Sequence, residues 1–131
     1  MTVLDASAVL EWLLQRPAAE QIERRFLTAA ESLYAPHLLD LEVTQVLRRY
    51  ESQGKLTAER GRQALTDLQD LPLTRVPHDL FLPRIWQLRH NVTAYDAAYL
   101  ALAEAIPAPL VTCDGRLARA PGHRATVEVI G

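Results

Sequence analysis

The stretch Thr2-Val3-Leu4-Asp5-Ala6-Ser7-Ala8 decides the fold class, because a short apolar run ends at an acid and a helix signal follows at once. The run 2–4 predicts a buried strand. Ser7 is a plausible helix N-cap, because its hydroxyl can accept a hydrogen bond from an N–H group of the first turn. Apolar residues then follow at helical spacing, namely Val9, Leu10, Leu13 and Leu14. A buried strand that leads into a helix is typical of an α/β protein.

The alternation of strand and helix continues along the chain. Further short strands are expected at 33–35, 73–76, 110–112 and 127–130. Further helices are expected to begin near Pro17, Leu39 and Thr57 and to cover 80–89 and 95–105. This order predicts a parallel sheet of about four or five strands with helices on both faces, a three-layer α/β/α sandwich. No linker, repeat or low-complexity tract interrupts the pattern, so residues 1–131 are expected to form a single domain.

The charge balance neither favours nor excludes a nucleic-acid partner. The chain has 14 basic and 16 acidic residues, a net charge of −2. If four acids share a metal pocket, 12 acidic groups remain against the 14 basic ones. All the basic residues except Lys55 are arginines, which suit bidentate phosphate contacts. Candidates for RNA contacts are Arg84, Arg89, Arg116, Arg119 and Arg124, although a solvated surface charge is the ordinary explanation of each.

Several features indicate a cytoplasmic protein without a membrane segment. The N-terminus has an acid at position 5 and no basic segment before it, unlike a signal peptide. No apolar stretch is long enough to span a bilayer. Cys113 is the only cysteine, which excludes an internal disulfide and a zinc knuckle and fits a reducing compartment.

Two acids are expected at the carboxyl ends of strands. Asp5 follows the first strand, and Asp114 follows the strand 110–112. In open parallel sheets, functional groups gather at this edge, near the point where the strand order reverses. Taken alone, each acid has an ordinary explanation: Asp5 as a cap or loop residue, and Asp114 with Gly115 as part of a turn.

Two further acids lie on expected helices. Glu42 falls three residues after Leu39 and four before Val46, so it shares the apolar stripe of its helix, where an uncompensated carboxylate is costly. A first-turn position favoured by the helix dipole, or an arginine partner, would also explain it. Asp96 follows Thr93 at the spacing of a capping box, and it can begin a helix and still direct its carboxylate at a ligand.

Together, the four acids occur in an order that resembles the PIN-domain family along nearly the whole chain, and the length and helix order look most like VapC toxins. The motifs are Val3-Leu4-Asp5-Ala6-Ser7, Leu41-Glu42-Val43, Tyr95-Asp96-Ala97-Ala98-Tyr99-Leu100-Ala101 and Val111-Thr112-Cys113-Asp114. The resemblance implies that the metal ligands and catalytic acids are Asp5, Glu42, Asp96 and Asp114. It implies supporting hydroxyl groups at Ser7 and at Thr93 or Thr112.

The resemblance also implies a Mg²⁺-dependent endoribonuclease, the toxin of a type II toxin–antitoxin pair, that leaves a 5′-phosphate and a 3′-hydroxyl. The implied partners are a VapB-like antitoxin, a structured transfer or ribosomal RNA and a second copy of the chain. An apolar antitoxin segment is expected to dock on the helices around 43–50 and 57–68. The chemistry agrees, because carboxylates that face one pocket repel one another unless a hard cation such as Mg²⁺ or Mn²⁺ binds between them.

Other classes of protein fit less well. A phosphatase or receiver domain needs a lysine across the pocket, whereas Lys55 lies between two expected helices, and the phosphatase pattern needs an aspartate in place of Ser7. The glycines form neither a P-loop nor a dinucleotide fingerprint. Cys113 stands where a small residue such as alanine is expected, and no histidine is placed to make it a nucleophile. The remaining alternative is a PIN fold that binds RNA or protein without cutting, which the presence of all four acids disfavours.

Overall fold

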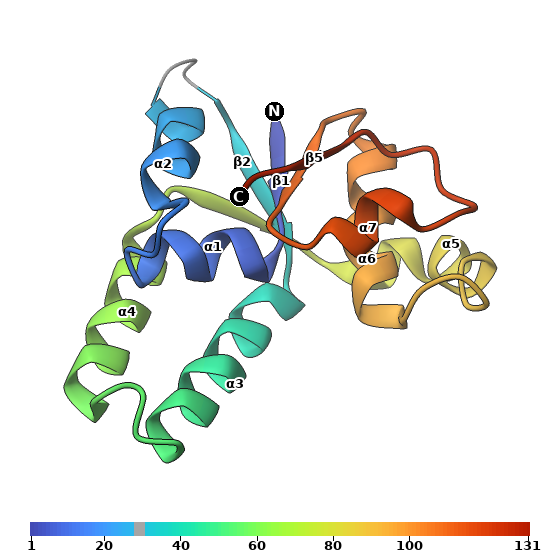
Figure 1. Ribbon diagram of the computed structural model, residues 1–131. Coiled ribbons are helices and arrows are strands. Elements are labelled where there is room, and N and C mark those ends of the chain that lie inside the picture. Colours follow the sequence, from blue (N-terminus) through green and yellow to red (C-terminus); the bar gives the residue numbers. More distant parts are fainter. Residues whose placement is uncertain (28–30) are drawn as a thin grey trace.

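The computed structural model describes residues 1–27 and 31–131, and a parallel sheet lies at its centre (Figure 1). The strands are β1 (Thr2–Leu4), β2 (Leu33–Pro36), β3 (Leu73–Val76), β4 (Leu110–Thr112) and β5 (Val127–Val129). Within the described residues they form one five-stranded sheet in the order β3-β2-β1-β4-β5, and every neighbouring pair is parallel. The predicted α/β/α sandwich is confirmed.

Helices cover both faces of this sheet (Figure 1). The described helices are α1 (Ala6–Leu13), α2 (Ala19–Leu27), α3 (Leu38–Ser52), α4 (Ala58–Asp70), the 3₁₀ helix η1 (His78–Phe81), α5 (Leu82–Gln87), α6 (Ala94–Ala105) and α7 (Gly115–Arg119). Helix α1 contacts β4, whereas α6 packs on β1 and β2. In Figure 1, α1 and α2 lie on one side of the sheet, and α5 and α6 lie on the other.

The core lies where α6 packs against the central strands. Seven consecutive residues of α6, 97–103, are buried, and four of them are alanines. Their small side chains let the helix approach β1 and β2 closely. Because a close-packed interior leaves little room for adjustment, the buried part of α6 fixes the position of the more exposed first turn that precedes it. This turn carries Asp96.

The strand order reverses at β1, which pairs with β2 on one side and with β4 on the other. The carboxyl ends of β1 and β4 therefore lie next to each other, with Leu4 opposite Val111. In open parallel sheets, such a switch point is where functional groups gather. The chain places Asp5 directly after β1 and Asp114 two residues after β4.

Asp5, and not Ser7, caps α1. The Asp5 carboxylate accepts a hydrogen bond from the Ala8 N–H group at 3.0 Å, and the helix begins at Ala6. The prediction of Ser7 as the N-cap is wrong because the chain enters the helix directly from the strand, where Asp5 is already a good capping residue. Thr57 and Thr93 cap α4 and α6, as the sequence predicts.

Two other segments differ from the expectation. The helix expected over 80–89 is divided into η1 and the short α5, whose first turn contains Pro83. Helix α7 is absent from the sequence-based prediction because Asp114-Gly115 has the signature of a turn, whereas Asp114 in fact caps this helix. Among the described residues, no helix is long and apolar enough to cross a membrane.

Candidate active site

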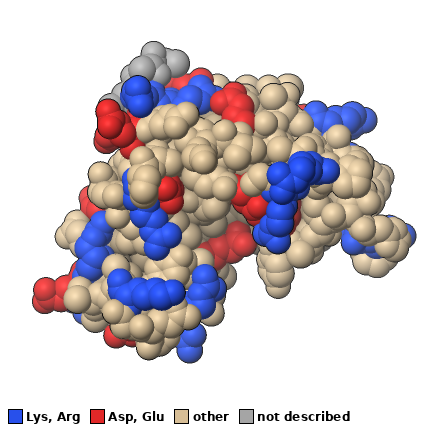
Figure 2. Space-filling model, in the orientation of Figure 1, with Lys and Arg blue, Asp and Glu red and all other residues tan. Residues whose placement is uncertain are grey.

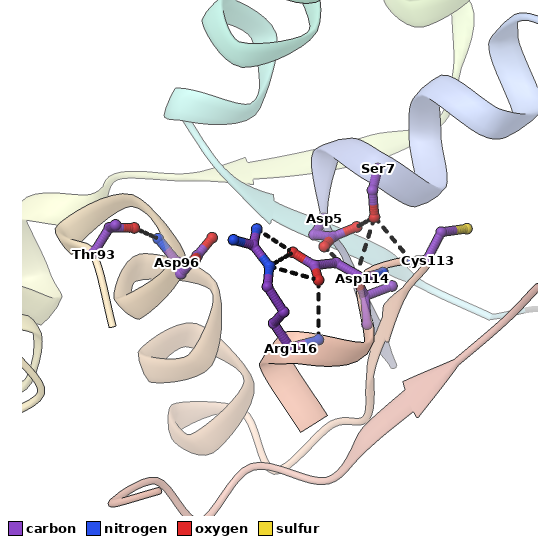
Figure 3. A network of polar contacts seen from close by, with 8 residues as sticks. Asp5, Ser7, Thr93, Asp96, Cys113, Asp114 and Arg116 are labelled. Atoms are coloured by element: carbon purple, nitrogen blue, oxygen red, sulfur yellow. Dashed lines mark hydrogen bonds and ion pairs between the residues drawn. The ribbon is translucent and has the colours of Figure 1, made fainter. Parts of the chain in front are cut away.

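Asp5 occupies the centre of the site, at the junction of β1 and α1. It is only 5% exposed. One carboxylate oxygen accepts a hydrogen bond from the Ser7 hydroxyl at 2.7 Å (Figure 3). The same oxygen accepts from the Ala8 N–H group at 3.0 Å. The other oxygen accepts a short hydrogen bond from the hydroxyl of Thr112, the last residue of β4. Strand β4 therefore helps to fix the acid that follows β1.

Asp5 determines where the hydroxyl protons of Ser7 and Thr112 point, because an ionised carboxylate only accepts hydrogen bonds. Each hydroxyl oxygen is then available as an acceptor. Ser7 accepts from the Cys113 N–H group and Thr112 accepts from the Asp114 N–H group, both at 2.9 Å. This network joins the backbone that follows β4 to the side chain that follows β1.

Burial raises the pKa of Asp5, even though its hydrogen bonds from Thr112, Ala8 and Ser7 act in the opposite direction. The charge of Asp114 raises this pKa further. The hydrogen bonds of the protein therefore do not fully offset the loss of water around the ionised carboxylate. A bound cation would offset it.

Glu42 of α3 is held by Tyr99 of α6. The Tyr99 hydroxyl, which belongs to an almost fully buried side chain, donates a hydrogen bond to Glu42 Oε1 at 2.5 Å. Burial raises the pKa of Glu42, and the charges of Asp96 and Asp5 raise it further. Burial also raises the pKa of the Tyr99 phenol, so this group stays protonated and remains a donor. Glu42, Asp96 and Asp5 therefore share one electrostatic environment.

Asp96 lies near the same acids from the first turn of α6. The Thr93 hydroxyl accepts a hydrogen bond from the Asp96 N–H group at 3.1 Å, so Thr93 sets the backbone from which the carboxylate extends. Burial raises the pKa of Asp96 and the charge of Asp114 raises it further, whereas Arg116 lowers it. Asp96 is therefore a half-buried carboxylate with an incompletely balanced charge.

Asp114 differs from the other three acids because it already has a cation. Its Oδ2 atom lies 2.7 Å from Nη2 of Arg116, and this contact lowers the pKa of Asp114. Figure 3 shows the Arg116 guanidinium between the carboxylates of Asp114 and Asp96. The Arg116 side chain is 80% exposed, so little packing holds it in this position.

The four acids come to one edge of the sheet, but their side chains do not form a closed metal cage. In the part of the chain that the structure describes, no group of three or more His, Cys, Asp and Glu side chains is arranged so that it could hold a metal ion. Figure 2 shows acidic side chains grouped near the centre of this face, with basic side chains directly beside them. The site is an open group of carboxylates with an arginine at its border.

A family model described as "PIN domain" matches residues 2–123. The chain belongs to the PIN domain family. This PIN domain is 39% identical over 130 residues to Ribonuclease VapC12 of Mycobacterium tuberculosis, with 99% of each chain covered. It is 44% identical over 132 residues to Ribonuclease VapC1 of the same organism, with 98% of this chain and 96% of the relative covered.

A solved structure has the same fold as this PIN domain. It is that of VapBC2 from Rickettsia felis bound to a DNA fragment from their promoter, with a TM-score of 0.72 at 14% identity and with 99% of this chain and 98% of the other covered. The family model and the two VapC relatives confirm the predicted resemblance to VapC proteins of the PIN-domain family, and the solved structure confirms the fold.

Two residues of the site, Tyr99 and Arg116, are not among the four acids and the supporting hydroxyl groups that the sequence predicts. Tyr99 binds Glu42, and Arg116 pairs with Asp114. Tyr99 lies three residues after Asp96, so both project from one side of α6. This spacing indicates that Tyr99 lies on the same side of the helix as Asp96, but it does not identify Glu42 as the partner of Tyr99. The sequence nominates Arg116 only as an RNA contact, because its pairing with Asp114 depends on helix α7, which the sequence does not predict.

Cys113 is not activated as a nucleophile. Burial raises the pKa of its thiol to about 11, and the charges of Glu11 and Asp5 contribute to the rise. Figure 3 shows the sulfur pointing away from the carboxylates. The thiol is protonated at neutral pH and is therefore a poor nucleophile.

Thr112→Val is expected to destabilise this PIN domain by about 1–3 kcal/mol, because the isosteric side chain leaves a buried Asp5 oxygen without its donor. The loss should be larger at about pH 8 than at about pH 5, because the carboxylate becomes fully ionised only as the pH rises through the raised pKa of Asp5. Chemical denaturation at both pH values tests this, with Thr44→Val, which removes an exposed hydroxyl of α3, as the control. Equal small losses in both variants would show that Thr112 does not support Asp5.

Proposed function

We propose that this chain is a metal-dependent endoribonuclease that hydrolyses RNA phosphodiester bonds as the toxin of a type II toxin–antitoxin pair. The observation that carries the proposal is the grouping of Asp5, Glu42 and Asp96 at the switch point of the sheet, where all three pKa values are raised. Carboxylates whose pKa values are perturbed by burial and by one another are typical of a catalytic site. The names of the VapC relatives, which are called ribonucleases, support RNA as the substrate.

The donor set fits Mg²⁺, with Mn²⁺ as a possible substitute. The four acids, Asp5, Glu42, Asp96 and Asp114, supply only oxygen atoms, which hard divalent cations prefer. Burial, and to a lesser extent repulsion by neighbouring acids, raises the pKa values of the first three, and a cation would offset both effects. A divalent cation bound here would polarise a phosphate oxygen and lower the pKa of a water molecule.

The acids are held in different ways, which suggests different tasks. Asp5 is fixed by Ser7, Thr112 and the first turn of α1, so it is the best-oriented ligand. Tyr99 holds Oε1 of Glu42 and leaves Oε2 for a ligand. An acid whose geometry is set before binding loses little side-chain entropy when a cation or a water molecule is held.

Asp114 contributes from the border of the site. Its carboxylate is neutralised by Arg116, so a direct metal contact requires this exposed ion pair to open. While the pair is closed, Asp114 still raises the pKa values of Asp5 and Asp96 through its negative charge. We therefore propose that it orients water or the substrate and becomes a metal ligand only after Arg116 moves.

A VapB-like antitoxin is the proposed partner. Leu41 is 75% exposed in the first turns of α3, the helix that also carries Glu42, so it offers an apolar contact to a partner that binds this helix. At the other end of α3, three cations lie 4.9–5.8 Å from the centre of the Tyr50 ring, namely Arg16, Arg49 and Lys55. This end favours acidic residues in the partner. The homodimer and the structured transfer or ribosomal RNA substrate stay predictions.

Glu42→Gln separates a nuclease from a silent binding module. The cleavage rate of the variant is expected to fall by at least ~100-fold. The reason is that a bound metal ion stabilises the charge of the transition state by several kcal/mol, and the variant lacks one of the carboxylates that would hold this ion. Its affinity for RNA should be unchanged or slightly higher, because repulsion of phosphate falls. Glu51→Gln, at the exposed end of the same helix, should behave like the wild type.

The measurement is cleavage of a radiolabelled structured RNA against Mg²⁺ concentration, with filter binding of the RNA in EDTA. The protein must first be freed of any co-purified partner. A wild type that binds RNA but cleaves none at any Mg²⁺ concentration is a silent module. Equal cleavage by the wild type and Glu42→Gln would remove Glu42 from the site.

A further inference from the structure

A surface hollow of about 680 Å³ opens beside Asp96, and basic side chains line it. Arg89 reaches it from the turn after α5, and Arg116 and Arg119 reach it from α7. Asp96 is the only acid among the described residues that line the hollow. The hollow is therefore locally positive, although the whole chain has a net charge of −2.

The structure divides the five arginines that the sequence nominates for RNA contacts. Three of them, Arg89, Arg116 and Arg119, line the hollow. Arg84 instead pairs with Glu104 at 2.8 Å, and Arg124, whose backbone N–H group donates to the same carboxylate, lies outside the hollow. The charge of Arg84 is thus largely neutralised by Glu104.

Among the residues that the structure describes, no carboxylate forms an ion pair with Arg89 or Arg119. Arg89 lies over the Trp86 ring, 4.5 Å from its centre, and donates a hydrogen bond to the Trp86 carbonyl at 2.9 Å. These contacts orient its guanidinium and leave its charge available. Arg119 has no carboxylate partner among the ion pairs of the described residues.

Gly115 leaves room for Arg119 beside the acidic cluster. A Cβ atom at position 115 would lie 3.1 Å from Arg119 Nη1, so the guanidinium packs over the start of α7. It lies near enough to Asp114 for its charge to help lower the pKa of that acid. A guanidinium that forms no ion pair within the described part of the chain is thus held at the border of the carboxylates.

We propose that this hollow binds the phosphodiester backbone of the RNA next to the bond that is cut, with Arg89 and Arg119 as phosphate ligands. Arg116 exchanges Asp114 for a phosphate when RNA binds. The inference rests on the proposed nuclease function. A strand that leaves the carboxylates past Asp96 enters the hollow directly, and guanidinium groups pair bidentately with phosphate. Arg89 and Arg119 are positioning residues, because they hold the strand and do not touch the reacting atoms.

The test measures binding of a fluorescein-labelled single-stranded RNA by anisotropy, in EDTA and between about 50 and 200 mM NaCl. The variants are Arg89→Gln and Arg119→Gln, with Arg62→Gln as the matched control, since Arg62 is an exposed arginine of α4 outside the hollow. Each hollow variant is expected to raise Kd by about 3–10-fold and to reduce the log–log salt slope by ~0.7, the value for one lost phosphate contact on a single strand. Arg62→Gln should change neither quantity.

The salt dependence of RNA binding decides the proposal. If the log–log salt slope of Arg89→Gln and of Arg119→Gln is the same as the slope of Arg62→Gln, the proposal is overturned. Unchanged RNA binding together with lost binding of the antitoxin would overturn it in favour of an acidic protein segment.

Cleavage kinetics with Mg²⁺ distinguish this proposal from the nuclease function. A raised KM with little change in kcat in the two variants supports RNA binding in the hollow. An unchanged KM refutes RNA binding in the hollow but does not contradict the nuclease function. RNA binding through these arginines without any cleavage would refute the nuclease and leave an RNA-binding hollow.

Discussion

Asp5→Asn is expected to lower the rate of RNA cleavage by at least ~100-fold, because each loss of about 1.4 kcal/mol of transition-state stabilisation is tenfold in rate. Asp5 is the most buried and most completely oriented acid of the site. An amide of the same shape removes the charge that a divalent cation needs. The measurement is the initial rate on a radiolabelled structured RNA at saturating Mg²⁺.

The fold should survive this change. The asparagine oxygen can still accept the hydrogen bond from the Ala8 N–H group, and the Thr112 hydroxyl can rotate to accept from the new amide. Asp79→Asn, at an exposed position in η1, is the matched control and should cleave like the wild type. Near-normal cleavage by a folded Asp5→Asn protein would contradict the assignment of Asp5.

Asp96→Asn is expected to abolish cleavage and yet to stabilise the metal-free protein. Burial and the charge of Asp114 raise the pKa of Asp96 in the folded state, so its ionised form destabilises the fold. The gain in the free energy of unfolding should be smallest at about pH 4, where the carboxyl is still partly protonated in the unfolded chain and more so in the folded protein, and should grow as the pH rises through the raised pKa. Mg²⁺ should then raise the Tm of the wild type more than that of the variant.

Thermal unfolding of the wild type, Asp96→Asn and Asp79→Asn between about pH 4 and pH 8 checks this, first in EDTA and then with Mg²⁺. The control should follow the wild type at every pH. If Asp96→Asn were less stable than the wild type at pH 8 in EDTA, the charge of Asp96 would not destabilise the fold, contrary to what its burial and the nearby charge of Asp114 predict.

The fold could be predicted from the sequence because its strands are short apolar runs between strong helix signals. Strands 73–76 and 110–112 are found within the predicted limits. The errors lie where two local signals compete. Asp5 and Ser7 are both good caps, and only the absence of a loop after β1 decides between them. Asp114-Gly115 is compatible with a turn or with a helix start, and packing of the buried Leu117 favours the helix.

The site could be predicted only in part, because its contacts join elements that are distant in sequence. Motif and strand position nominate all four acids, but they do not show that Tyr99 holds Glu42 across 57 residues. They also leave open whether Thr93 or Thr112 supports a carboxylate. The structure places Thr112 on the Asp5 side chain and Thr93 on the Asp96 backbone. Such choices depend on side-chain directions that are set by packing between elements.

Binding of Mn²⁺, followed by the loss of its free-ion electron paramagnetic resonance signal, tests most directly whether these carboxylates hold a divalent cation. The wild type and Asp79→Asn should bind Mn²⁺ with the same affinity, and excess Mg²⁺ should displace it. Asp5→Asn, Glu42→Gln and Asp96→Asn should each weaken binding by at least ~10-fold, the effect of losing about 1.4 kcal/mol. Equal Mn²⁺ affinity in the wild type and all three variants would contradict a metal site built from Asp5, Glu42 and Asp96.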